Sequence, residues 1–153
     1  MKIEYLGNQE LLQLEKTAFL APRKVAPGAI MPSYDRATEL VRQGRCVISG
    51  FTSPIERDVW GFLIRGTQPI ILVSARNKYT KIPAQYIPLL DSGRLLIVFL
   101  GLGTQLSRAT AFRRNEYVAE LADAIIFASM HPGSSLYAIY DKYRGRKPVD
   151  VLG

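Results

Sequence analysis

The stretch from Ala111 to Leu136, AFRRNEYVAELADAIIFASMHPGSSL, contains the signals that decide the fold of this chain. A basic segment at 112–115 opens a predicted helix, and the apolar run 124–128 predicts a buried strand after it. The small-residue loop 131–135 predicts the start of a second helix. Because helix N-termini present free N–H groups and a positive dipole end, two such starts within one stretch predict phosphate recognition.

The rest of the chain repeats this alternation of strands and helices. Short apolar runs predict further strands at 17–21, 45–49, 69–74, 94–100 and 149–152. Helical spacing, with Pro or Ser near the start and Gly at the end, predicts helices at 32–43 and 54–65. Two other stretches are predicted to be less regular: a lead-in segment at 1–16 with a short helix near 10–14, and 75–93 with a short helix between its prolines.

Strands that alternate with helices are typical of a parallel sheet covered on both faces. We therefore predict one Rossmann-like α/β domain over residues 1–153, a three-layer sandwich with a mostly parallel sheet and helices on both faces. Ligands of such sheets bind outside the carboxyl ends of the strands.

Composition restricts the partners and the site chemistry. The formal charge of +7 favours a polyanion such as nucleic acid or a nucleotide. With one Cys and one His, an internal disulfide is excluded and a His/Cys zinc site is disfavoured, so we expect no metal and a cytoplasmic location. The sequence has neither a 20-residue apolar run nor the hydrophobic region of a signal peptide, and we expect no membrane association.

No motif for catalysis or for a cofactor is present. The Gly101-x-Gly103 segment lacks the third glycine and the acidic residue of a dinucleotide fingerprint, so it predicts a turn after a strand. His131 has no neighbouring carboxylate in the sequence, and no Gly-x-Ser-x-Gly elbow surrounds Ser134 or Ser135. We therefore expect no enzyme activity and no cofactor.

Two segments are candidates for anion binding, each with an alternative structural role. Small and hydroxyl residues at 49–53, between a strand and a helix, allow backbone N–H groups to approach an anion, but they also suit capping of that helix. Arg113 and Arg114 at a helix start would oppose the helix dipole, which predicts pairing with Glu116 or Glu120, or phosphate binding.

These segments together resemble the DNA-processing protein A family (DprA, also called Smf). Ser49-Gly50, Phe112-x-Arg114-Asn115 and Gly133-Ser134-Ser135-Leu136 are similar to its Ser-Gly, Phe-Pro-x-Arg-Asn-Arg and Ser-Gly-Ser/Thr-Leu motifs, in that order. Gly7 to Leu12 and the strand end at 21–24 resemble its Gly-Asn-x-x-Leu-Leu and Gly-Ser-Arg segments. The resemblance therefore spans nearly the whole chain.

The chain also departs from the family pattern. Pro54-Ile55-Glu56 stands near the place of the family's Gly-Ile-Asp, and Pro22 replaces the serine of Gly-Ser-Arg. The histidine of the following helix is absent, and Trp60 lies near its place. The family's helical N-terminal and winged-helix-like C-terminal domains are also missing from this sequence.

The resemblance implies a Rossmann-like core that binds single-stranded DNA in a basic pocket and hands it to the RecA recombinase during DNA uptake, in a family that tends to dimerise. Motif position assigns the phosphate pocket to Arg23, Ser49, Gly50, Arg114, Asn115, Gly133 and Ser134. Charge and place add Lys24, Arg57 and Arg113, and the small-residue loops at 49–53 and 131–135 add Ser53 and Ser135.

A second interpretation keeps the fold and changes the ligand. Wider relatives include nucleotide-sensing modules and lysine-decarboxylase-like phosphoribohydrolases, whose last loop carries Pro-Gly-Gly-x-Gly-Thr-x-x-Glu. The corresponding run from Pro132 to Ile139 has no carboxylate at that place, which disfavours hydrolysis. A non-catalytic nucleotide sensor stays open as the alternative.

Overall fold

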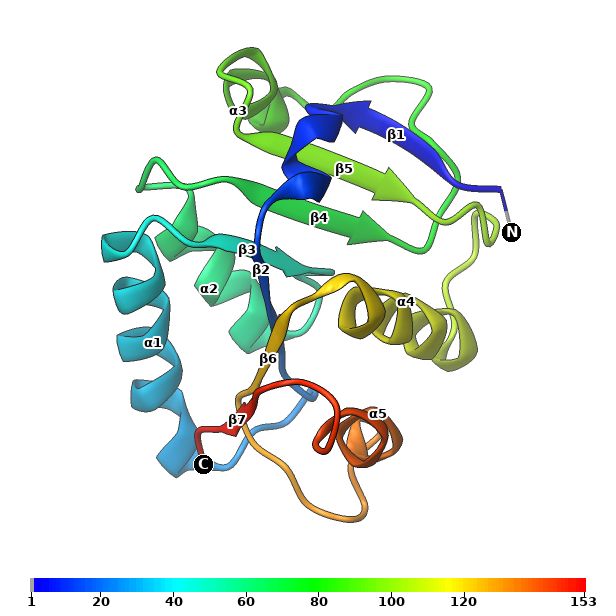
Figure 1. Cartoon of the computed structure of the whole chain (residues 1–153). Coiled ribbons are helices and arrows are strands. Elements are labelled where there is room, and N and C mark those ends of the chain that lie inside the picture. The colour runs from blue at the N-terminus through cyan, green and yellow to red at the C-terminus, as the bar shows by residue number, and fades with distance from the viewer. Residues whose placement is uncertain (1) are drawn as a thin grey trace.

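A single seven-stranded sheet runs through the computed structural model, which describes residues 2–153 (Figure 1). The strands are β1 (Glu4–Gly7), β2 (Lys16–Leu20), β3 (Cys46–Ser49), β4 (Ile70–Ser74), β5 (Leu95–Phe99), β6 (Ala124–Phe127) and β7 (Val149–Val151). Their order across the sheet is β1-β5-β4-β3-β2-β6-β7. Every neighbouring pair is parallel except β1 with β5, so the predicted mostly parallel sheet is confirmed.

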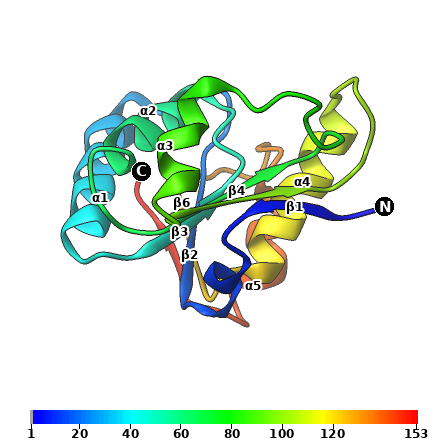
Figure 2. The ribbon, with the colours of Figure 1, turned by 90° about the horizontal axis from the view of Figure 1, so that it is seen from above.

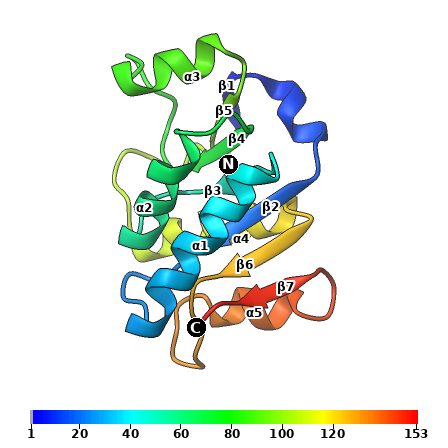
Figure 3. The same ribbon diagram turned by 90° about the vertical axis from the view of Figure 1, so that its left-hand side faces the viewer.

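Helices cover both faces of the sheet (Figures 2 and 3). One face carries α1 (Ile30–Arg42), α2 (Pro54–Leu63) and α3 (Ile87–Asp91), and the other carries α4 (Arg108–Leu121) and α5 (Tyr137–Tyr143). Single 3-10 turns occur at Gln9–Gln13, Pro27–Ala29 and Ala84–Tyr86. The three-layer Rossmann-like architecture is the one that the sequence predicts.

The strands are continuous apolar runs because helices cover both faces of the sheet. In β5, Leu96 and Val98 pack into the core beneath α4 and α5, whereas Leu95, Ile97 and Phe99 pack toward α1, α2 and α3. All five side chains have no exposed surface. A strand with one face in water would alternate between apolar and polar residues instead.

The N-terminal segment is more regular than the sequence predicts. The short helix near residues 10–14 is present as the 3-10 turn Gln9–Gln13, but residues 4–7 form β1, which pairs antiparallel with β5. This four-residue edge strand carries no run of apolar residues, because it needs a partner on one side only. The sequence predicts no strand in this segment, so β1 is a feature that only the structure reveals.

Helix α4 begins earlier than predicted. Ser107 is its N-cap, since its Oγ accepts from the Thr110 N–H at 3.2 Å while Thr110 Oγ1 accepts from the Ser107 N–H at 2.8 Å. Arg113 and Arg114 consequently lie in the second turn, and the prediction that they stand at a helix N-terminus is wrong. The last helix starts at Tyr137, not in the loop 131–135 as predicted.

The strand order changes direction at β2, because β3 lies on one side of β2 and β6 lies on the other. The connection after β2 leads to α1 on one face of the sheet, whereas the connection after β6 leads to α5 on the opposite face. Loops that diverge in this way leave a crevice at the carboxyl ends of the two strands, where ligands of open α/β sheets bind.

Candidate phosphate-binding site

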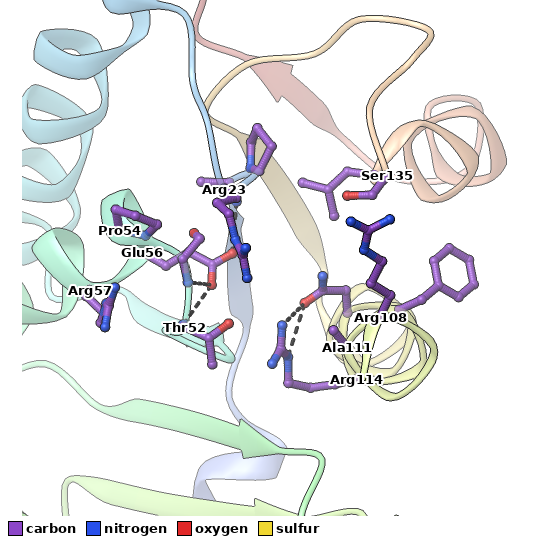
Figure 4. Close-up of a pocket in the computed structure, with 15 residues that line it drawn as sticks. Arg23, Thr52, Pro54, Glu56, Arg57, Arg108, Ala111, Arg114 and Ser135 are labelled. Atoms are coloured by element: carbon purple, nitrogen blue, oxygen red, sulfur yellow. Dashed lines mark hydrogen bonds between the residues drawn. The ribbon is translucent and has the colours of Figure 1, made fainter. Parts of the chain in front are cut away.

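A cavity of about 670 Å³ lies at this crevice (Figure 4). Its wall is formed by the segment after β2, by the turn between β3 and α2 together with the first turn of α2, by one side of α4 and by the loop before α5. These four segments come from widely separated parts of the sequence, and the strand order brings them to one edge of the sheet.

Four arginines line the cavity: Arg23, Arg57, Arg108 and Arg114 (Figure 4). The first three are exposed, and their side chains make no hydrogen bond or ion pair with any residue in the range 2–153. Unpaired guanidinium groups that converge on one cavity produce a positive potential suited to an anion with several oxygens, such as a phosphate.

Arg114 is the buried member of this set, with 6% of its surface exposed. Its Nε and Nη2 donate to Asn115 Oδ1 at 3.3 and 3.1 Å, so two of its five donors are engaged and others remain for a ligand. Burial lowers the pKa of Arg114, and the charge of Glu56 opposes that shift. Arg114 forms neither of the ion pairs considered for it, with Glu116 or with Glu120, and the Glu120 carboxylate accepts from the Tyr143 hydroxyl at 2.5 Å.

Glu56 is a buried acid in the wall of the cavity, 1% exposed. Its carboxylate accepts three backbone N–H bonds, from Ala21 at 2.9 Å, Thr52 at 3.0 Å and Ser53 at 3.3 Å. Burial raises the pKa of Glu56, and these N–H groups and Arg114 oppose the rise. Glu56 therefore joins the end of β2 to the turn after β3.

The turn between β3 and α2 is held by its own side chains. Ser49 is fully buried and its Oγ accepts from the Phe51 N–H at 3.1 Å, while Phe51 has a positive φ of 52°. Ser53 is the N-cap residue of α2 and lines the cavity, and its Oγ is buried without a hydrogen-bond partner in the described chain. Ser49 thus shapes the turn from behind, and Ser53 reaches the cavity.

Gly50 is required by the position of Arg114. A Cβ atom at residue 50 would lie 2.4 Å from Arg114 Nε and 2.9 Å from its Cζ, far inside van der Waals contact. Since the guanidinium is the end of a flexible side chain, it can move while the fold persists.

We expect Gly50→Ala to displace Arg114 and weaken single-stranded DNA binding by roughly tenfold, with an unchanged circular dichroism spectrum. Fluorescence anisotropy with a labelled oligonucleotide measures the change. Gly28→Ala is the matched control, because nothing lies within 4 Å of a Cβ there. Equal affinities of the two variants would contradict the role given to this contact.

The structure brings together half of the residues predicted from the sequence. Those that line the cavity are Arg23, Ser53, Arg57, Arg114, Asn115 and Ser135. Gly50 lies against Arg114 and lines a second cavity that adjoins the first. Ser49 lies behind the turn. The remaining four line neither cavity: Lys24, Arg113, Gly133 and Ser134.

Loop 131–135 is organised by its own hydrogen bonds. The Gly133 N–H donates to His131 Nδ1 at 3.1 Å, and Ser134 Oγ accepts from the Leu136 N–H at 3.1 Å. These bonds account for Gly133 and Ser134 as turn residues, and Ser135 is the member of the loop that reaches the cavity together with Leu136.

Sequence reasoning missed Arg108 and Glu56. Ser53-x-x-Glu56 has the spacing of a capping box, a signal that places an acid beside the turn. Arg108 has no comparable signal, because its place in the wall depends on the true start of α4.

Within residues 2–153, no helix is long and apolar enough to cross a membrane. The same residues contain no cluster of three or more His, Cys, Asp and Glu side chains that could hold a metal ion.

Among known proteins, the chain is similar to solved structures but to no family model or curated sequence. No family model matches the sequence, and a search of curated proteins found no similar sequence. DprA from Streptococcus pneumoniae superposes with a TM-score of 0.76 at 20% identity, over 97% of this chain and 54% of that protein. DprA from Helicobacter pylori, solved to explain its single-stranded DNA binding mode, gives 0.73 at 20% identity over 98% and 71%.

A molybdenum cofactor binding protein from Rippkaea orientalis is a more distant match, with a TM-score of 0.59 at 14% identity over 90% of this chain and 76% of that one. This chain thus spans about half the length of the pneumococcal DprA and about seven tenths of the H. pylori protein. The DprA structures superpose over nearly all of this chain, whereas the cofactor binding protein superposes less closely. The chain therefore has the Rossmann-like fold of these DprA structures.

Proposed function

We propose that the arginine-lined cavity binds the phosphate groups of single-stranded DNA. The observation that carries this proposal is that Arg23, Arg57, Arg108 and Arg114 line one cavity at the carboxyl edge of the sheet. Three of these guanidinium groups have no partner among the described residues, so no internal ion pair must be broken before an anion binds.

Two further observations favour a nucleic acid as the source of the phosphate. The chain carries a net charge of +7, which favours binding to a polyanion. The H. pylori protein of the same fold was solved for its single-stranded DNA binding. A free nucleotide is the second candidate, since the cavity volume of about 670 Å³ is in the range of small-ligand sites.

We propose a binding role without catalysis. The carboxyl group that lines the cavity, Glu56, is engaged by three backbone N–H groups and is thus poorly placed to act as a general base. The serines of the wall, Ser53 and Ser135, have no histidine beside them in the lining. Transfer of the strand to RecA, a homodimer and a cytoplasmic location stay predictions from the sequence.

The test is fluorescence anisotropy of a labelled oligo-dT of about 20 nucleotides across a salt series, with and without competing mononucleotide. We expect binding that weakens steeply with salt and resists the mononucleotide. Arg57→Ala should weaken binding and lower the slope of log affinity against log salt by about 0.7, the contribution of one single-strand phosphate contact.

Arg65→Ala is the matched control, because Arg65 is exposed just beyond the far end of α2 and lines neither cavity. Its affinity and salt slope should equal those of the unmodified protein. If a free mononucleotide displaces the oligonucleotide, the proposal is wrong and the site is that of a nucleotide sensor. Absence of binding to both ligands would overturn it.

A further inference from the structure

A second cavity, of about 320 Å³, adjoins the arginine-lined one on the side of β4. The two cavities share Thr52, Arg57 and Arg114 in their walls. The second cavity is otherwise formed by the ends of β3 and β4, by α2 and by the segment that precedes α3. A ligand that occupies both must pass over the shared arginines.

The second cavity is rich in aromatic side chains, which we call the aromatic cavity: Phe51, Trp60, Tyr79 and Tyr86. The Trp60 ring lies 5.1 Å from that of Phe51 and 5.8 Å from that of Tyr86, both edge to face. Trp60, Tyr79 and Tyr86 are only partly buried. Tyr79 stacks on Tyr86 with ring centroids 6.3 Å apart, and the Arg76 guanidinium lies 4.8 Å from the Tyr79 ring centroid. These contacts hold the rings in place, and the three partly buried rings line the cavity wall.

Polar groups accompany the aromatic rings. The Gln85 side chain is exposed in the wall and makes no hydrogen bond within residues 2–153, so its amide offers both donors and an acceptor. Burial and the neighbouring Tyr86 raise the pKa of Tyr79 to about 12. A heteroaromatic base that stacks on the rings can pair with the Gln85 amide, whereas an apolar peptide side chain makes no such hydrogen bond.

We infer that the aromatic cavity takes one nucleobase of the strand whose phosphate lies in the arginine-lined cavity. The inference rests on the proposed function and adds to it the recognition of a base. In a nucleotide one deoxyribose joins an anionic phosphate to an aromatic base, which matches an arginine-lined cavity joined to an aromatic one across Arg57 and Arg114. Base stacking on aromatic side chains is tolerant of sequence, so this site serves any strand.

The chain offers a direct probe, because Trp60 is its only tryptophan and lines the aromatic cavity. The experiment titrates the protein with oligo-dT and with an abasic oligonucleotide of equal length, and records anisotropy and Trp60 emission together. We expect both strands to bind, oligo-dT more tightly, and only oligo-dT to quench or shift the Trp60 emission.

A substitution tests the same site by affinity. Tyr86→Ala should weaken oligo-dT binding roughly tenfold and leave abasic binding unchanged, while Tyr86→Phe, which keeps the ring, should restore oligo-dT binding. The control is Tyr137→Ala, since Tyr137 is a partly buried tyrosine on α5, in contact with Tyr140 and remote from the aromatic cavity. That variant should bind both strands normally.

The outcomes separate this inference from the proposed function. Binding of both strands with equal affinity and unchanged Trp60 emission would overturn the base site and leave the phosphate site standing. A loss of oligo-dT affinity in Tyr137→Ala but not in Tyr86→Ala would also overturn it, by placing base contacts on α5. Failure of both strands to change the anisotropy would overturn the proposed function and this inference together.

Discussion

Replacement of Arg114 by alanine is expected to reduce the affinity for single-stranded DNA by about tenfold to a hundredfold. The buried guanidinium lines both cavities and is shielded from water, so its contact with a phosphate is worth more than that of an exposed arginine. A charged hydrogen bond of this kind contributes about 1.5–3 kcal/mol, which corresponds to the stated loss. Fluorescence anisotropy at constant salt measures it.

Two companion variants make this result specific. Arg114→Lys keeps the charge and loses the planar fork, so it should bind with an affinity between those of the alanine variant and the unmodified protein. Arg65→Ala should bind normally, since Arg65 lines neither cavity. If Arg114→Ala binds DNA with full affinity and keeps its native circular dichroism spectrum, the site assignment is wrong.

The largest expected effect on stability follows from Glu56→Gln, which should lower the free energy of unfolding by about 3 kcal/mol. Both carboxylate oxygens of Glu56 accept backbone N–H bonds, so the amide nitrogen of glutamine must face either the Ala21 N–H or those of Thr52 and Ser53. A buried donor then loses its acceptor, and Arg114 loses a nearby opposite charge. Urea unfolding followed by circular dichroism measures the difference.

The same carboxyl group makes stability depend on pH. Because the pKa of Glu56 in the folded protein is raised above its ordinary value of 4.5, the folded state binds more protons than the unfolded state within that interval. The contribution of Glu56 is thus complete below pH 4.5 and declines as pH rises through the raised pKa. Glu56→Gln should remove this decline, whereas Glu10→Gln, at an exposed acid, should leave the free energy of unfolding within about 0.5 kcal/mol of the original.

The sequence predicts the sheet well because the strands are continuous apolar runs. β3, β4 and β5 are buried on both faces, and that composition is recognisable without knowledge of neighbours. β1 lacks the signal, since an edge strand of four residues depends on β5 and not on its own hydrophobicity. The start of α4 was missed for a related reason: Ser107 and Thr110 cap it by mutual hydrogen bonds, without the acid of the usual capping box.

The candidate site was only partly predictable. Motif order singled out Arg23, Arg114 and Asn115, which do line the arginine-lined cavity. Local sequence gave no reason to expect that a charged residue in the second turn of α4 would be buried, because its burial depends on Gly50, a residue 64 positions away. The aromatic cavity was missed since its rings come from three segments, one of them in the irregular stretch 75–93.

The position of β6 beside β2 has a consequence for the kinetics of folding. Their junction joins residues far apart in the chain: the Lys16 N–H donates to Asp123 across 107 positions. Contacts of such long sequence separation carry a large loop-closure cost and slow the folding rate. We therefore expect the loops after β2 and β6 to meet only once this pairing has formed, so that the arginine-lined cavity is completed late in folding. Substitutions confined to a late-forming region change the rate of unfolding more than the rate of folding.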